Sequence, residues 1–497
     1  MKVLTRGNAQ IARKIALLAA SVALFCGNAC AEPWIEAGDS SLRSDIEVLA
    51  AAGVIDDITM QWPLPWAGIL DRLNSPAALN GEPDFVREAA DRVRARGLAE
   101  TRSGQARLGL TVDAAGSPNI IRGFDALGRQ NLQGQASIDW LSGSTAVHVA
   151  LGAQSVSPKD RQVFVPDGSY VSQRLGGAVV YAGYVTHWWG PGWISALSLS
   201  NNARPVPQIG IARADTAAFD SPWLSWLGPW QMEFFAGVLE GPRLARNTIY
   251  DGFRFGFSPL PHLEIGLSRT DEMCGTGHPC KPLAGYFNLE NENNAVNIVN
   301  DEGTIDVRYS NTLGRWAYEL YTQAMNEDTS PIVHSGTSHL VGGSVWTAWA
   351  TGTGRLTIEY ADSVATRDIW GGGIFHGFAY NNRGYPDGMR YRDRTLGFSL
   401  DSDSRLLSVQ AAFADHDGRD LTLTYHHADV SDPLNGLGNV VTASAVTINQ
   451  LQGRVTLPFH WGEHGVRLDV EARYQDDQPR PDKGALATVE AELAFAL

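Results

Sequence analysis

Apolar and polar residues alternate along short segments of this chain from about Leu108 to the C-terminus. The alternation is clear in "VRLDVEARY" (466–474), "TIDVRYS" (304–310), "RLTIEYAD" (355–362) and "LTLTYH" (421–426). Successive side chains of a β-strand point to opposite faces, so each segment is predicted to be a strand with one apolar and one polar face. Roughly sixteen to twenty such segments can be marked, too many for one small sandwich.

The alternation does not decide which face lies inside. In a small soluble barrel the apolar face is packed inward, whereas in a large membrane barrel it meets lipid and the charged face lines a wet lumen. The last segment, "TVEAELAFAL" (488–497), alternates up to the C-terminus, as in the closing strand of outer-membrane barrels, although it ends in Leu497 with Phe495 two residues earlier. These features favour a mostly β chain: a large antiparallel transmembrane β-barrel over residues 101–497.

Residues 1–31 are predicted to be a cleaved signal peptide. The apolar core at 15–25 is too short to span a bilayer, and Ala29-Cys30-Ala31 offers a cleavage site. A lipoprotein signal at Cys30 is the weaker alternative, because Gly27-Asn28-Ala29 lacks the branched apolar residue expected there. The basic residues that precede the apolar core are Lys2, Arg6, Arg13 and Lys14.

Residues 32–100 are predicted to form a small helical bundle. "DSSLRSDIEVLAAAG" has helical apolar spacing, with Asp39 or Ser40 as a cap and Gly53 as a stop. "PWAGILDRL" and "PDFVREAADRVRARG" are two further short helices, and the second of these is expected to end at Gly97.

Charge and hydropathy narrow the classes of protein to which this chain can belong. The chain has 39 Lys and Arg against 54 Asp and Glu, a net charge of −15, which disfavours nucleic acid as a partner. After the signal peptide, no stretch has the roughly 20 apolar residues of a transmembrane helix. An exported chain of this kind is periplasmic, secreted or an outer-membrane barrel.

Two cysteines follow the signal peptide, in "MCGTGHPCKP". In an oxidising compartment, Cys274 and Cys280 are expected to form a local disulfide. A metal site with His278 as third ligand is the alternative, but no fourth ligand lies nearby in the sequence.

The sequence contains no G-x-S-x-G, H-E-x-x-H or P-loop motif, so the chain is predicted not to be an enzyme and to need no cofactor. A pair of carboxylates suited to a glycosidase stays open as an alternative, because acidic residues are abundant.

The segment "HWWGPGWISALSLSNNARP" (187–205) contains three tryptophans around a Gly-Pro-Gly break. We expect a strand end, the break and a new strand within the barrel wall. The first two rings should then point to opposite faces, one into the interfacial aromatic girdle and one into the lumen. A sugar-binding hypothesis uses ring faces for stacking and the polar residues for hydrogen bonds, and the alternative is packing alone. The candidate residues are Trp188, Trp189, Trp193, Asn201, Asn202 and Arg204.

A second polar and aromatic stretch, "HGFAYNNRGYPDGMRYRDR" (376–394), has the composition of a carbohydrate-contacting loop. An ordinary ordered loop is the alternative. Its candidate residues are Tyr380, Asn381, Asn382, Arg383, Tyr385 and Tyr391.

The chain resembles the Wzi capsule-assembly family of outer-membrane proteins at "YVTHWWGPGWISALSLSNNARPVPQIGIAR". Further blocks that look like this family are "LRSDIEVLAAAGVIDDITMQWPLPW", "LEIGLSRTDEMCGTGHPCKP", "YTQAMNED", "IEYADS" and "YRDRTLGFSLDSDSR". The resemblance implies an outer-membrane barrel of about eighteen strands with a helical bundle on the periplasmic side.

The resemblance also implies a lectin-like role without catalysis, in which the protein holds capsular polysaccharide or exopolysaccharide at the cell surface. The implied partners are that polysaccharide, outer-membrane lipid and the polysaccharide export machinery. A saccharide channel and a polysaccharide-degrading enzyme remain the alternatives.

If the C-terminus is periplasmic, successive connections between strands alternate between the two sides of the membrane. This count puts one long connection on the periplasmic side, where short turns are expected. "DHDGRD" (415–420) and "DSDS" (401–404) have the composition of tight hairpins, and the long stretch 364–393 then falls on the periplasmic side. Either a strand is missed there or the stretch folds into the barrel. An inward fold would narrow the lumen and disfavour an open pore.

Overall fold

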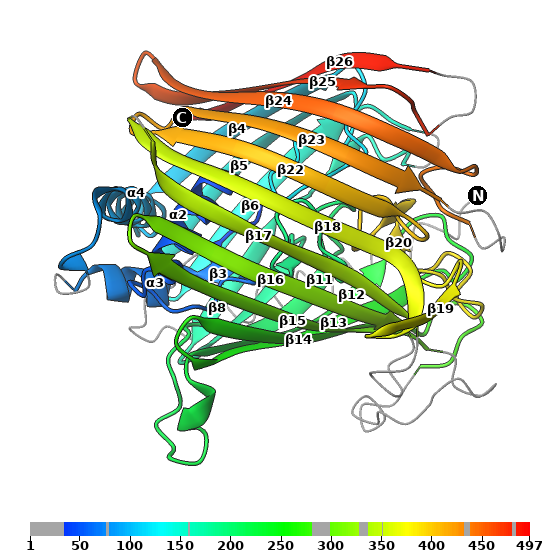
Figure 1. Cartoon of the computed structure of the whole chain (residues 1–497), viewed down its shortest axis with the longest axis horizontal. Helices are drawn as coiled ribbons and strands as arrows, with labels where there is room; N and C mark the ends of the chain where they lie inside the picture. Colours follow the sequence, from blue (N-terminus) through cyan, green and yellow to red (C-terminus); the bar gives the residue numbers. More distant parts are fainter. Residues whose placement is uncertain are drawn as a thin grey trace.

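The computed structural model describes residues 34–75, 79–157, 160–280, 299–327, 336–349, 351–431, 438–479 and 484–497. The predicted signal peptide lies outside these residues. Within them, twenty strands form a closed antiparallel sheet (Figure 1). Because β6 pairs directly with β8 and β18 with β22, the short strands β7 (Phe164–Val165) and β19 (Gly371–Phe375) are additions, and the ring itself has 18 strands.

The ring strands are β4 Ala106–Ala115, β5 Leu132–Ser142, β6 Thr145–Gln154, β8 Tyr170–Leu175, β9 Ala178–Gly183, β11 Gln208–Arg213, β12 Trp230–Leu239, β13 Thr248–Leu260, β14 Leu263–Met273, β15 Asn300–Leu313, β16 Trp316–Glu327, β17 Thr337–Trp349, β18 Gly352–Asp368, β22 Arg405–Asp415, β23 Asp420–Val430, β24 Val446–Trp461, β25 His464–Gln475 and β26 Leu486–Ala496. The ring closes where β26 pairs with β4, with Phe495 opposite Leu110. The prediction of a large antiparallel barrel is confirmed.

The charged faces of the strands point into the lumen. In β25, Asp469, Glu471 and Arg473 are 1%, 4% and 4% exposed, whereas Tyr474 is 54% exposed on the outer surface. Leu356 and Ile358 of β18 likewise face outward. An apolar outer surface around a charged interior is the arrangement of a barrel that spans a membrane. Among the described residues, no helix is long and apolar enough to cross a bilayer.

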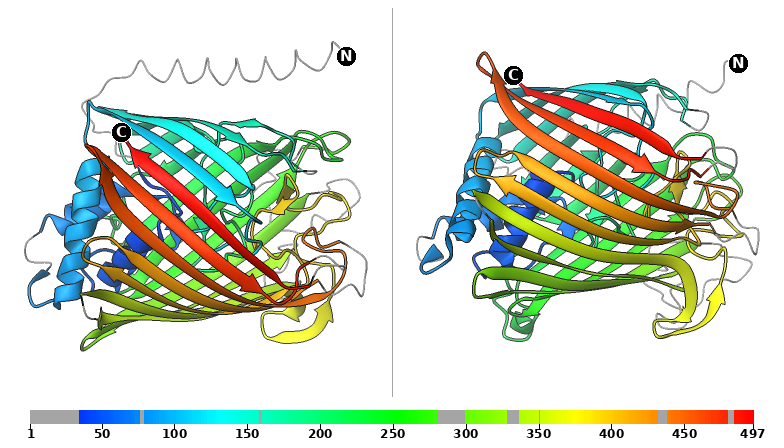
Figure 2. Two further views of the ribbon diagram at one scale, coloured as in Figure 1. Left: turned by 90° about the horizontal axis from the view of Figure 1, so that it is seen from above. Right: turned by 45° about the horizontal axis from the view of Figure 1, so that its top comes forward.

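The two ends of the barrel differ in the length of their connections. Short turns such as 314–315 and 462–463 lie at the end that carries the C-terminus and the helices (Figure 2). Long connections such as 184–207 and 376–404 lie at the opposite end. In outer-membrane barrels short turns are periplasmic and long loops extracellular, so the helices lie on the periplasmic side.

Two helices, α3 (Trp66–Leu73) and α4 (Asp84–Glu100), cover the periplasmic end, and α2 (Ser40–Ala51) lies buried beside them. The Asp39 carboxylate caps α2 by accepting a hydrogen bond of 3.0 Å from the Leu42 N–H, as the sequence predicts. The predicted stop at Gly97 is wrong, because α4 continues to Glu100. A Cβ on Gly97 would collide with α3, so this glycine serves close helix packing instead.

The lumen is filled by what we call the plug: the N-terminal segment 34–66 and the connections 116–131, 184–207 and 376–404. Inside the plug, β10 (Trp188–Trp189) pairs with β2 (Gln61–Trp62), β1 (Trp34–Ile35) pairs with β3 (Leu64–Pro65), and β20 (Arg390–Tyr391) pairs with β21 (Arg394–Thr395). Plug and wall residues share one hydrophobic cluster, so the division into separate domains at residue 100 stays a prediction.

The structure corrects the prediction for the tryptophan-rich segment. Trp188 and Trp189 are both 0% exposed inside the barrel, so neither belongs to the interfacial girdle. The chain leaves the wall after Gly183 and returns at Gln208, and β10 pairs with the N-terminal segment instead of with a wall strand. Only Trp188 and Trp189 form a strand here, and the new wall strand expected after the Gly-Pro-Gly break is wrong, because residues 190–207 contain only an isolated bridge, from Leu199 to Trp189.

The conflict over residues 364–393 is also resolved. After β19 the chain folds into the lumen and returns only at β22, so 376–404 is one inward connection. The hairpin expected at 401–404 is wrong, because these four residues are buried at its end, with Asp401 and Ser404 0% exposed. The hairpin at 415–420 is confirmed, with Gly418 at a φ of 77° in the turn between β22 and β23.

Candidate functional site: the plug and its extracellular mouth

A buried charge network anchors the base of the plug. Arg308 of β15 is 1% exposed and donates to Glu319 of β16 at 2.8 Å and to the Thr59 hydroxyl at 2.7 Å. It also pairs with Glu47 of α2 and lies 3.8 Å from Glu264 of β14. Three carboxylates around one guanidinium join the N-terminal segment to the wall, and each is stable there only because its charge is compensated.

Arginines hold the Gly-Pro-Gly break in the middle of the lumen. Arg43 of α2 donates to the carbonyl oxygens of Pro191 at 2.7 Å and Gly192 at 2.8 Å. Its guanidinium lies 4.2 Å from the centre of the Trp193 ring, and Arg355 of β18 lies 3.6 Å from the same ring. These two cation–π contacts help to fix the orientation of the ring.

Wall carboxylates bind the same turn through its N–H groups. The Trp193 backbone N–H donates to Glu359 at 2.7 Å and its indole N–H to Glu319 at 2.7 Å. Glu359 also accepts from Ile194 N–H at 3.2 Å and from the Tyr321 hydroxyl at 2.9 Å. Hydrogen bonds to a charged group are stronger than those between neutral groups, so Glu359 acts as a clamp between the plug and the wall.

The three candidate tryptophans are interior residues. Trp188 and Trp189 are 0% exposed and Trp193 is 2% exposed. The Trp188 indole N–H donates to the Gly192 carbonyl oxygen at 3.0 Å, within its own turn. Sugar stacking needs an exposed ring face, so the stacking role remains an untested prediction that would require the plug to move.

Asn201, Asn202 and Arg204 tie the plug to neighbouring connections. The Asn201 amide donates to the Phe124 carbonyl oxygen at 2.7 Å, and the Asn202 amide to that of Thr395 at 2.8 Å. Arg204 binds Asp167 through Nε at 2.8 Å and Nη2 at 2.7 Å, and Asp160 through Nη1 at 3.1 Å. Burial alone would lower the pKa of Arg204, but the hydrogen bonds and charges of these two carboxylates outweigh burial and raise it.

Replacing Arg204 by lysine removes the two-point bond to Asp167 while keeping the charge. We expect the free energy of unfolding to fall by about 1.5–3 kcal/mol, measured by urea titration of the protein in lipid vesicles. The control is Arg161→Lys, an exposed position on the same connection as Asp160, with an expected change within about 0.5 kcal/mol. Equal stability of the two variants would show that the two-point hydrogen bond between the Arg204 guanidinium and Asp167 does not contribute to stability.

The second candidate stretch divides into an inner and an outer set. The inner set is aromatic: Tyr380 and Tyr385 are 0% exposed and Tyr391 is 2% exposed. The Tyr380 hydroxyl donates to the Leu197 carbonyl oxygen at 2.7 Å and joins two plug connections. The outer set consists of half-buried Asn381 and Asn382 and exposed Arg383.

Cys274 and Cys280 are joined by a disulfide beside the plug. The Tyr385 hydroxyl donates to the Cys274 carbonyl oxygen at 3.0 Å, and the His278 ring stacks on Tyr385 with centroids 4.3 Å apart. Sulfurs bonded to each other are not thiolate ligands, and no group of three metal-ligating side chains occurs in the part of the chain that the structure describes.

Sequence reasoning missed a group of three arginines near the extracellular mouth, Arg122, Arg129 and Arg394. Their guanidinium groups bond mainly to backbone oxygens: Arg122 to Leu127 and Gly128 at 2.7 and 2.8 Å, Arg129 to Asn201 and Asn202 at 2.7 and 3.3 Å, and Arg394 to Arg129 at 3.1 Å. Arg122 and Arg129 share one connection, but Arg394 lies far away in the sequence, so no local pattern could have grouped the three.

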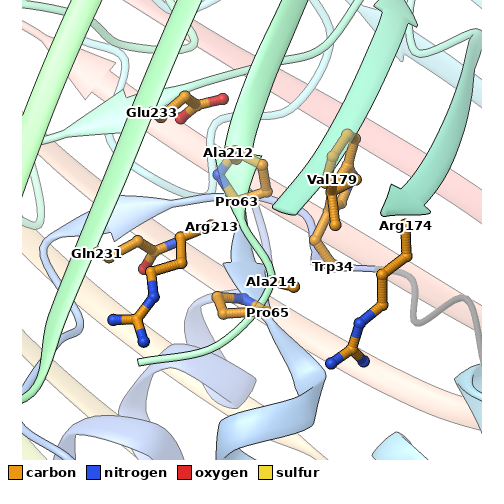
Figure 3. A pocket seen from close by; sticks show the side chains of 10 residues that line it. All are labelled: Trp34, Pro63, Pro65, Arg174, Val179, Ala212, Arg213, Ala214, Gln231 and Glu233. Carbon is orange, nitrogen blue, oxygen red and sulfur yellow. The ribbon is translucent and has the colours of Figure 1, made fainter. Parts of the chain in front are cut away.

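A small cavity lies on the periplasmic side of the plug. Figure 3 shows Pro63 and Pro65 of the N-terminal segment among side chains of the wall, with Trp34 beside Val179 of β9. Its volume is about 20 Å³, room for a water molecule but not for a sugar ring. This cavity is therefore not a candidate glycan site.

An apolar outer surface, a charged lumen and an internal plug define an outer-membrane β-barrel of the plugged type. The family model of the capsule assembly protein Wzi matches residues 109–478. The chain belongs to this family, which confirms the resemblance identified in the sequence.

Two relatives extend this comparison. A Klebsiella pneumoniae protein, described as an uncharacterized 55.8 kDa protein in the cps region, is 26% identical over 364 residues, 70% of either chain. The solved structure of Wzi from Escherichia coli is similar with a TM-score of 0.80 and 22% identity, and the alignment covers 94% of this chain and 100% of that one. That protein is described as an outer-membrane, carbohydrate-binding β-barrel involved in group 1 capsule assembly.

Proposed function

We propose that this protein binds capsular polysaccharide or exopolysaccharide at the extracellular mouth of the barrel and holds it at the cell surface. The observation that carries the proposal is the plug, which occupies the lumen and is anchored by buried charges on the wall. The similar Escherichia coli protein is described as carbohydrate-binding, which supports the same role here. In this proposal the glycan contacts the outer set of polar residues, of which Asn381 and Asn382 are half-buried and Arg383 is exposed.

Two alternative functions are a saccharide channel and a polysaccharide-degrading enzyme, and the plug argues against the first. A saccharide channel needs a continuous wet path, whereas here Trp193, Tyr380 and their neighbours fill the lumen between strands. A polysaccharide-degrading enzyme would shorten glycan chains, which a binding protein does not do. We favour a role without catalysis, in which the periplasmic helices face the polysaccharide export machinery and the apolar outer surface faces outer-membrane lipid.

Deleting the gene is expected to release polysaccharide into the medium while its synthesis continues, and plasmid-borne wild-type protein should restore retention. The measurement is the ratio of cell-attached to soluble polysaccharide at equal total amount. An unchanged ratio in the deletion strain would contradict the proposal.

Two further measurements separate the alternatives. In planar lipid bilayers the purified protein should give no steady conductance, and a stable open pore would favour the channel. Incubation with the host's polysaccharide should leave its chain length unchanged, and shortened chains would favour the enzyme.

A further inference from the structure

The arginines of the plug divide into a paired and an unpaired set. Arg204 contacts two carboxylates, and Arg392 contacts Asp160 at 3.2 Å. Arg122, Arg129 and Arg394, by contrast, have no carboxylate within 4.0 Å among the described residues. Carbonyl oxygens satisfy part of their hydrogen-bonding capacity but do not neutralise their charge.

Carboxylates beyond ion-pair distance, such as Asp160 and Glu490 near Arg394, compensate the charge of the unpaired set only in part. Burial lowers the pKa of Arg394 to about 10, and the charge of Arg129 adds to the effect. Burial and the charges of its two arginine neighbours likewise lower the pKa of Arg122. Arginine stays protonated at neutral pH, so these shifts mean that a nearby anion would stabilise the cluster.

Two of the three arginines of the cluster are partly exposed to solvent. Arg129 lies on the β4–β5 connection and Arg394 on β21, both half-buried, while Arg122 behind them is 3% exposed. The Asn201 amide oxygen and Arg122 Nε are buried with no hydrogen-bond partner among the described residues. The Asn202 side-chain oxygen accepts from Arg394 at 3.5 Å, so both asparagines border the cluster.

We propose that Arg129 and Arg394, backed by Arg122, form a binding site for the carboxylate of an acidic sugar residue in the polysaccharide. A guanidinium group matches a carboxylate in shape and charge and can bind it at two points. This inference rests on the proposed glycan-binding function and names the chemical class of the glycan: a uronic-acid polymer, not a neutral one.

The test compares the polysaccharide of the producing strain in its native form with the same polymer after its carboxyl groups have been reduced to alcohols. Binding to the purified full-length protein is measured by calorimetry. We expect native polymer to bind wild-type protein at least about tenfold more tightly than reduced polymer, and this difference to shrink as salt is added. Free glucuronate should compete, and inorganic phosphate at the same concentration should not.

The variants are Arg129→Gln and Arg394→Gln, singly and together, with Arg246→Gln as a control at an exposed position on the same face. We expect the double variant to lose about tenfold or more in affinity for native polymer and to keep wild-type affinity for reduced polymer. Because Arg129 also bonds to the backbone, Arg129→Lys is measured as well. It keeps the charge and should retain part of the preference for native polymer.

Four other outcomes would overturn the proposal, and each would do so for a different reason. Equal binding of native and reduced polymer by wild-type protein would overturn the carboxylate site and leave glycan binding intact. Loss of both polymers in the double variant would assign these arginines a merely structural role. Competition by phosphate as strong as by glucuronate would mean a site for any anion, and failure of wild-type protein to bind either polymer would overturn the glycan-binding function itself.

Discussion

Replacing Arg308 by methionine is expected to lower the free energy of unfolding by about 3–5 kcal/mol, because removing one partner of a buried ion pair leaves the others uncompensated. Here Glu47, Glu264 and Glu319 would all lose their common cation. The measurement is urea-induced unfolding of the barrel in lipid vesicles, followed by the folded fraction on unheated gels.

Two further variants test the cause of that loss. Arg72→Met removes a surface pair with Asp56 whose arginine is 58% exposed, and its cost should be about 0–1 kcal/mol. Adding Glu47→Gln and Glu319→Gln to the Arg308 variant should recover part of the stability, because two buried charges disappear. An Arg308 variant as stable as the Arg72 variant would mean that the network does not anchor the plug.

Replacing Glu359 by leucine is expected to detach the plug from the wall and to open a conducting path. Three donors, the N–H groups of Trp193 and Ile194 and the Tyr321 hydroxyl, lose their acceptor together. Hydrogen bonds to a charged group contribute about 1.5–3 kcal/mol each, so the combined loss should exceed about 4 kcal/mol. The measurement is single-channel conductance in planar bilayers, where wild-type protein should be silent.

Two matched variants accompany this experiment: one keeps a hydrogen-bond acceptor at position 359, and the other removes an exposed carboxylate from a turn of the wall. Glu359→Gln keeps one acceptor oxygen and should give rare, brief openings. Glu463→Leu, at an exposed position in the turn between β24 and β25, should be silent like wild-type protein. Silence of the Glu359→Leu variant would contradict the role of this carboxylate as the clamp.

The wall of the barrel was predictable because its signal is local. A strand with one face in lipid and one in a wet lumen shows a period of two within a few residues, as in β25 and β18. The direction of the faces was not predictable from those residues alone, because Asp469 and Tyr474 alternate in the same way in either orientation. The resemblance to the Wzi family supplied the choice that the alternation left open.

The plug was harder to predict because its contacts are not local. The pattern around Trp188 and Trp189 predicted wall strands, but only these two residues form a strand, and its partner, Gln61–Trp62, lies far away in the sequence and enters from the opposite end of the barrel. The segment 401–404 has the composition of a hairpin and is instead buried beneath the extracellular mouth. Short polar runs rich in Asp and Ser favour turns, but they do not specify what the turn connects.

The candidate site was only partly accessible from the sequence. Aromatic and amide residues suited to sugars were identified, and several of them prove to hold the plug together, as Tyr380 does. The unpaired arginines became visible only after every carboxylate near them had been located, which requires the fold. Arg122, Arg129 and Arg394 come from two connections that are far apart in the chain.

The hydrogen bonds between plug and wall make the barrel one cooperative unit. A long extracellular connection ordinarily opens locally and exchanges its amide hydrogens quickly. Here the amides of Trp193 and Leu197 donate to Glu359 and Gln323 of the wall, so they can exchange only when those bonds to wall strands break. A segment that is a loop by topology therefore has the rigidity of a strand, and a glycan resting on it would meet a surface that is already organised before binding.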